Sequence, residues 1–188
     1  EAEKKLAEAR AELQKRTEGQ LIESYRHMGM VNRKISLLLE LEDNLRRKRG
    51  KQEIADFMLD SAMAISGAAI GIFYECMGEA GFKIISSRGL SAEKKKNLQA
   101  VSVTDFDFIS RLVKDGKRTN GPVEFERSGN FKGNLEAIDY FVALPISRNN
   151  SCKGFIFLGF SGKKSMDVYE LEFLDVFSKH SSIAFLEA

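Results

Sequence analysis

The 188-residue sequence has no Trp, only two Pro, only two Cys and no long apolar run. Without a stretch of about 18 apolar residues, the chain is not expected to span a membrane. Two Cys placed at positions 76 and 152 match neither a disulfide framework nor a zinc motif, and this favours a reducing compartment such as the cytoplasm. A formal net charge of +2 gives no overall reason to expect a nucleic-acid partner.

Aromatic residues are unevenly distributed along the chain. All 14 Phe and both Pro lie at or beyond Phe57, whereas the only aromatic residue before it is Tyr25. The first part is instead rich in Lys, Arg and Glu. We therefore expect a helical segment over residues 1–49 and a globular domain over residues 50–188, which is long enough to bury its own core.

The N-terminal segment has the composition of one long helix. Residues 2–48 contain no Pro and are rich in Ala, Leu, Glu, Lys and Arg, which are strong helix formers. From Leu21 onward a seven-residue repeat predicts a coiled-coil seam. The seam consists of Leu21, Ser24, Met28, Val31, Ile35, Leu38, Glu42 and Leu45.

A lone helix with so narrow a stripe needs a partner helix. We expect a parallel homodimer, with packing of the helix onto its own domain as the alternative, and antiparallel pairing stays open. Upstream of the seam, the spacing of the seven-residue repeat changes near Thr17, and such a change locally unwinds a supercoil. Within the seam region, Gly29 weakens the helix. The basic run 46–51 is interpreted as a solvated helix end rather than a lipid or nucleic-acid patch, because no aromatic residues interleave it.

The Phe-rich part alternates between helical and strand patterns. An amphipathic pattern or an apolar run defines each expected element. We expect a first helix over 51–65, a second that includes Phe108–Val113 and stops at Gly116, and a third over 168–186. Strands are expected over 68–76, 82–88, 122–126, 140–147 and 153–161. This order predicts an α+β domain with about five to six antiparallel strands and helices on one face.

The order and spacing of these elements resemble those of a GAF domain over residues 51–188. The resemblance is carried by Ala68–Tyr74, by Ser86–Leu90, by Phe108–Gly121 with the following Pro122-Val123, and by Val142–Ile146 with Gly154–Leu158. It implies a non-catalytic sensory or regulatory module that binds a small molecule and signals along its end helices. A purely structural dimerisation module is the alternative. The PAS fold fits less well, because its helices usually lie between the second and fifth strands.

The signatures of particular GAF subfamilies are missing. There is no Asn-Lys-Phe-Asp-Glu run of the cyclic-nucleotide type, and neither Cys76 nor Cys152 has the neighbouring His of the bilin-binding type. Free methionine sulfoxide reductases of this fold carry clustered cysteines, which two distant Cys do not match. The resemblance therefore implies no enzymatic activity and no covalent chromophore, and it identifies no cofactor and no metal.

The resemblance also implies where a ligand would lie, namely between the sheet and the irregular segments that cover it. We expect the small residues Ala69 and Gly71 to face the end helices, which leaves the other face of that strand to the pocket. The pocket candidates are Ile70, Ile72, Tyr74, Phe125, Arg127, Phe131 and Phe141, with Ser128, Asn130, Lys132 and Asn134 as further polar donors. The alternative is that the apolar candidates are core and the polar ones belong to a solvated loop.

Three further side chains, two His and one Cys, are of types that often take part in chemistry. His27 lacks the acidic neighbour and the Pro of histidine-kinase phosphoacceptor helices, so we interpret it as solvated. His180, on the last helix, is expected to be packed or interfacial rather than a metal ligand. Cys152 is expected in an exposed hairpin turn, where redox sensing is a minor alternative.

Overall fold

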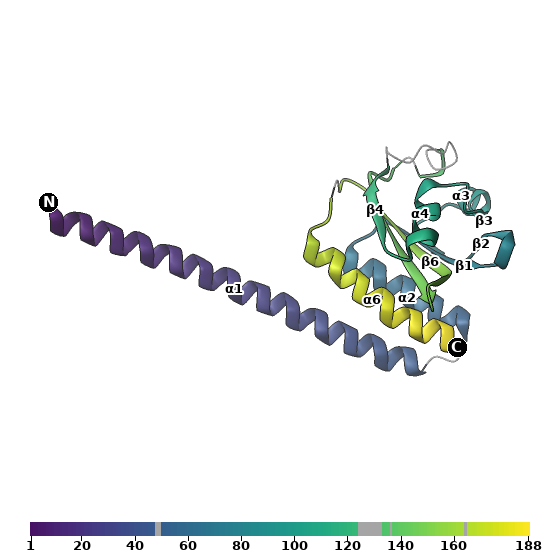
Figure 1. Ribbon diagram of the computed structural model, residues 1–188, viewed down its shortest axis with the longest axis horizontal. Coiled ribbons are helices and arrows are strands. Elements are labelled where there is room, and N and C mark those ends of the chain that lie inside the picture. Colours follow the sequence, from purple (N-terminus) through teal and green to yellow (C-terminus); the bar gives the residue numbers. More distant parts are fainter. Residues whose placement is uncertain (48–49, 124–132, 136, 164) are drawn as a thin grey trace. The chain divides into compact units, whose positions relative to one another are not determined.

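The computed structural model describes residues 1–47, 50–123, 133–135, 137–163 and 165–188 (Figure 1). These residues form two compact units, Glu1–Leu41 and Glu42–Ala188. Within the described ranges, no helix has both the length and the apolar character needed to cross a bilayer.

The first unit is helical from Ala2 onward. It belongs to α1, an uninterrupted helix of 46 residues from Ala2 to Arg47, so the prediction of one long helix is confirmed. Four seam residues are exposed, at 54% for Leu21, 56% for Met28, 39% for Val31 and 50% for Ile35. The stripe on which the coiled-coil prediction depends is therefore open over this part of the helix.

The second unit is built on a six-stranded sheet in which every neighbouring pair is antiparallel. In spatial order the strands are β3 (Ala100–Val101), β2 (Phe82–Arg88), β1 (Ile70–Cys76), β6 (Ser151–Phe160), β5 (Tyr140–Arg148) and β4 (Thr119–Pro122). The predicted hairpins are present as β1–β2 and β5–β6, and β1 and β6 pair at the centre. The antiparallel α+β prediction is thus confirmed.

Some elements differ from the predicted ones. The strand expected over 122–126 overlaps β4 at Pro122, since β4 begins earlier, at Thr119, and ends there, and residues 124–126 of the prediction lie outside the described residues. Three short elements, η1 (Gly78–Ala80), α3 (Ala92–Asn97) and β3, were not predicted, because elements of two to six residues are too short to show a period. The start of α3 does carry a local signal, since the Ser91 side chain accepts a hydrogen bond from the Lys94 backbone N–H.

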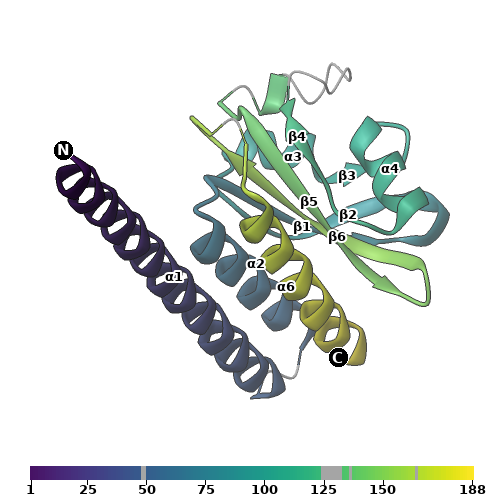
Figure 2. The same cartoon turned by 60° about the vertical axis from the view of Figure 1, so that its left-hand side comes forward.

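Two long helices lie side by side on one face of the sheet, α2 (Lys51–Ser66) and α6 (Val168–Glu187) (Figure 2). We call this the helix-pair face. A Cβ atom at Gly71 would meet side-chain atoms of Met63 and Leu59 on α2. As predicted, Gly71 faces the end helices because only a residue without a side chain leaves room for α2, whereas Ala69 precedes the strand and is exposed.

The opposite face is covered by the short helix α4 (Asp107–Asp115) and by connecting segments, and we call it the α4 face (Figure 2). It carries one apolar core, the α4-face cluster. Its members are Ile70, Ile72, Tyr74, Phe82, Ile84, Leu98, Val101, Phe106, Phe108, Ile109, Leu112, Val123, Leu135, Ile138, Phe141, Ala143, Phe155 and Phe157.

Two β-bulges decide which side chains reach which face. In β2, Phe73 pairs with Ser86 but Tyr74 pairs with Ile84, so Ile85 is an extra residue. Without it, strict alternation would place Ile84 and Ser86 on the same face. The bulge leaves Ile84 in the α4-face cluster and turns Ser86 toward α2.

Candidate functional site

The predicted pocket residues that the structure describes lie together in the α4-face cluster. Ile70, Ile72, Tyr74 and Phe141 are 8%, 1%, 3% and 1% exposed. Phe125, Arg127 and Phe131, together with Ser128, Asn130 and Lys132, lie outside the described residues. Among the polar donors, Asn134 is described, and its side-chain oxygen accepts a hydrogen bond of 3.0 Å from the Asn97 amide.

Tyr74 carries a polar group in this apolar face. Its hydroxyl donates a hydrogen bond of 2.9 Å to the Leu98 carbonyl oxygen, and its ring stacks on Phe155 with the ring centroids 4.8 Å apart. Burial raises the pKa of the Tyr74 phenol, so the group stays neutral at physiological pH. The Tyr74 hydroxyl therefore offers no charge to a ligand, and because its proton is donated to Leu98 it could only accept a hydrogen bond from one.

Aromatic rings fill much of the α4 face around Phe108. Its ring centroid lies 5.1 Å from that of Phe141, 5.5 Å from that of Phe157 and 5.9 Å from that of Phe155. These separations are those of directly packed aromatic rings. Where its residues are described, this part of the predicted pocket is therefore occupied by the protein's own side chains.

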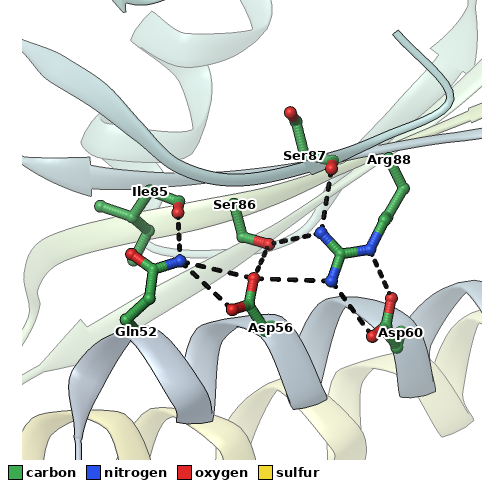
Figure 3. A network of polar contacts seen from close by, with 7 residues as sticks. All are labelled: Gln52, Asp56, Asp60, Ile85, Ser86, Ser87 and Arg88. Atoms are coloured by element: carbon green, nitrogen blue, oxygen red, sulfur yellow. Dashed lines mark hydrogen bonds and ion pairs between the residues drawn. The ribbon is translucent and has the colours of Figure 1, made fainter.

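A polar network joins α2 to β2 on the helix-pair face (Figure 3). Arg88 donates from Nε to one carboxylate oxygen of Asp60 at 2.8 Å and from Nη2 to the other at 3.2 Å. Its Nη1 donates to the Ser86 hydroxyl oxygen at 3.2 Å, and that hydroxyl donates to Asp56 at 2.5 Å. Gln52 donates to the carbonyl oxygen of the bulged residue Ile85 at 2.6 Å.

The network fixes the ionisation of Asp56. Burial opposes its negative charge, but hydrogen bonds from Ser86 and Gln52 and the nearby Arg88 guanidinium outweigh burial and hold the pKa of Asp56 below its ordinary value of 3.8. The contacts of Arg88 with Asp60, of Ser86 with Asp56 and of Gln52 with Ile85 join α2 to the bulged strand, whereas Gln52–Asp56 lies within α2 and Arg88–Ser86 within β2. The network is thus a polar attachment of α2 to the sheet, and no sequence pattern indicates it, because Ser86, Ser87 and Arg88 are all polar and show no alternation.

Replacing Asp56 with Asn should lower the free energy of unfolding by about 1 kcal/mol at pH 7, a modest loss because the side chain is partly exposed. Because the folded-state pKa of Asp56 lies below its unfolded value, its contribution is complete above that value and is lost as pH falls through the folded one. Urea unfolding at pH 7 and near pH 3 should therefore show the difference between the variant and the parent chain shrinking in acid.

The control for this comparison is Glu79→Gln, which removes an exposed carboxylate from η1. We expect it to leave the unfolding free energy nearly unchanged at both pH values. An Asp56→Asn difference that stays the same or grows at low pH would contradict the assigned role of the carboxylate.

Open grooves run along α6. One has a volume of about 700 Å³ and lies between α6 and the β4–β5 edge, with Lys117, Arg118 and Lys179 among its charged residues. Arg118 is already engaged, since its Nε lies 2.9 Å from an Asp175 carboxylate oxygen and its Nη1 donates to Asn120.

Within the described residues, no group of three or more His, Cys, Asp and Glu side chains could hold a metal ion.

The C-terminal end of the predicted seam, Glu42 and Leu45, belongs to the second unit and contacts other residues of that unit. Leu45 is 5% exposed and lines a groove of about 330 Å³ together with Ile54 and Ala184. Glu42 lies 2.6 Å from Nδ1 of His180. Contrary to the seam prediction, Leu45 is not open to a second copy, because its own chain already covers it.

The sequence predicted Cys152 in an exposed hairpin turn, and this prediction is wrong. It is the second residue of β6, is partly buried and packs against the α4-face cluster. The turn before it is shorter than predicted, because Asn149 and Asn150 both adopt positive φ and close the hairpin in two residues.

No protein-family model matches the chain, and no curated protein matches its sequence. Solved structures do match. The GAF domain of a phosphoenolpyruvate-protein phosphotransferase from Coxiella burnetii superposes with a TM-score of 0.71 at 11% identity, covering 82% of this chain and 94% of that one. The GAF domain of an Acinetobacter phosphoenolpyruvate-protein phosphotransferase gives 0.66 at 10% identity, with 84% and 95% covered.

A third solved structure is the phycocyanobilin-bound GAF domain from a cyanobacterial phytochrome. It superposes with a TM-score of 0.64 at 15% identity, covering 82% of this chain and 94% of that one. Identities this low establish the fold alone. The second unit of this chain therefore has the fold of GAF domains, preceded by a long helix, as the sequence resemblance predicts.

Proposed function

We propose that the chain is a non-catalytic, cytoplasmic signalling module, in which a GAF-fold domain binds a small ligand and a parallel coiled coil of two α1 helices joins two copies. The observation that supports dimerisation best is the exposed apolar seam on an uninterrupted helix, from Leu21 to Ile35. Apolar residues at this spacing lose their water contact when a second helix packs against them.

Between Leu21 and Leu39, flanking charges do not oppose in-register parallel pairing, whereas the two Glu42 carboxylates would face each other if the pairing continued that far. In a parallel coiled coil, the residue just before each a position lies near the residue five places later on the partner helix. These pairs would be Gln20 with Tyr25, His27 with Asn32, and Lys34 with Leu39, none of which brings like charges together.

A route from ligand to helices runs through the two faces of β1 and β2. Tyr74 and Ile84 belong to the α4-face cluster, whereas Phe73 and Arg88 on the same strands contact α6 and α2. A ligand that displaced a strand from the α4 side would shift its contacts with the helix pair. The bilin bound to the phytochrome GAF domain supports the idea that this fold accommodates small ligands.

The second candidate function is a structural dimerisation module without a ligand. The packed rings around Phe108 favour it, because they fill space that a ligand would need. The two candidates agree on the dimer and differ in what the α4 face contains.

Native mass spectrometry of the purified full chain tests both points, with denaturing spectra of the same sample as the control. We expect a dimer that carries additional mass, released as a small molecule on denaturation. A dimer of bare chains, in extracts and after purification, would favour the structural module. A monomer would contradict the proposed function in both forms.

A further inference from the structure

The fold brings the two cysteines together at one end of the central strand pair. Cys76 is the last residue of β1, and Cys152 is the second residue of β6. The two strands are antiparallel neighbours, with Glu75 opposite Gly154. The end of β1 and the start of β6 therefore lie next to each other, although the two thiols are far apart in the sequence.

The second β-bulge places both thiols on the same face. Phe155 lies in the α4-face cluster, so strict alternation would put Cys152 on the opposite face. However, β5 and β6 pair through Ile146 with Gly154 and then Ser147 with Cys152, so Lys153 is an extra residue. This bulge turns Cys152 to the α4 face, where Cys76 also packs against the cluster.

The pKa of Cys152 agrees with this placement of the two thiols. Burial is the largest cause that raises the pKa of Cys152, and the charge of Cys76 raises it further. The Gly154 backbone, Lys153 and the Ser147 hydroxyl act in the opposite direction. Both cysteines are free and partly buried. Because Cys152 is held as the thiol, Cys76 is the better first nucleophile of the pair.

We infer that Cys76 and Cys152 form a reversible disulfide between β1 and β6 when the protein meets a peroxide. This modification does not rest on the proposed function. First, the Cys76 thiolate attacks hydrogen peroxide: an S–O bond forms, the O–O bond breaks, and the leaving hydroxide takes a proton to become water. Cys76 is then a sulfenic acid.

In the second step the Cys152 thiol gives up its proton as its sulfur attacks the sulfur of that sulfenic acid. The S–S bond forms, the S–O bond breaks, and the departing hydroxide takes the Cys152 proton to leave as a second water. The two thiols together lose two electrons, which the peroxide accepts. A dithiol reductant returns both cysteines to thiols by exchange through a mixed disulfide.

The disulfide would connect β1 to β6, which lie far apart in the sequence but pair at the centre of the sheet. It would close a loop containing β2, α4, β4 and β5, so the unfolded chain would lose much of its freedom. We expect the melting temperature to rise by roughly 5 °C on oxidation. The bond would also tie together the two strands that carry Tyr74 and Phe155.

The test treats the folded full chain with hydrogen peroxide, blocks remaining thiols with an alkylating reagent, and measures the intact mass and the peptide map. We expect a single chain that has lost two hydrogen atoms, and a linked peptide pair containing Cys76 and Cys152. Dithiothreitol should restore the original mass and melting temperature.

Cys76→Ser and Cys152→Ser are the matched variants, and each should melt like the reduced parent chain. Neither should form the link, and in Cys152→Ser the Cys76 sulfenic acid should accumulate and be trapped by dimedone. Three outcomes would overturn the inference: bonds only between chains on a non-reducing gel, sulfinic acid without any link, or a link that forms only in denaturant.

Discussion

Replacing Phe108 with Ala is expected to lower the free energy of unfolding by about 3–5 kcal/mol. Phe108 is 2% exposed and its ring packs against Phe141, Phe155 and Phe157. Truncation removes apolar burial and leaves a cavity. The neighbouring rings of Phe141, Phe155 and Phe157 are held on packed strands and cannot easily move to fill it. For a chain of this size the melting temperature should fall by roughly 10 °C.

Calorimetry is the suitable measurement, because the chain contains no Trp to report unfolding by fluorescence. Phe108→Leu is the matched control and should cost much less, since it keeps most of the buried apolar volume. A loss below about 1 kcal/mol for the Ala variant would mean that Phe108 is not a central packing residue of the α4 face.

Replacing Ile35 with Asp is expected to weaken the proposed dimer by roughly 100-fold or more. Ile35 is half exposed in a single chain, so the substitution takes little burial from the monomer. In a parallel coiled coil, the two introduced carboxylates would face each other within an apolar seam, which costs several kcal/mol of association free energy. Sedimentation equilibrium of the full chain measures the effect directly.

Met30→Asp provides the control for the dimer prediction. Met30 lies on α1, is exposed at 55% and is apolar like Ile35, but its position is off the seam. We expect it to leave the dissociation constant nearly unchanged. Equal weakening by both variants would point to a general effect of charge on α1, and no weakening by Ile35→Asp would remove the seam from the interface.

Helices and hairpins with a clear period were predictable from the sequence. The strand Phe82–Arg88 has the predicted bounds, and α6 and β5 differ from theirs by one residue. Each is long enough for its apolar spacing or apolar run to identify it. The α1 helix was predictable for the same reason, together with the absence of Pro from residues 2–48.

Side-chain placement was predicted less well. Leu45 continues the heptad spacing but is covered within its own chain, because spacing identifies an apolar stripe without naming what covers it. The link from Arg88 to Asp60 joins β2 to α2, and neither segment carries a motif that specifies its partner.

What the sequence by itself determined is the division into a Phe-free helix and a Phe-rich α+β domain, since composition and periodicity are local properties of the chain. Only the tertiary structure decided which residues share a face. The extra residues Ile85 and Lys153 exist as bulges only relative to a paired strand. They turn Ser86 toward α2 and Cys152 toward Cys76, a placement that depends on strand pairing and is therefore absent from any single segment.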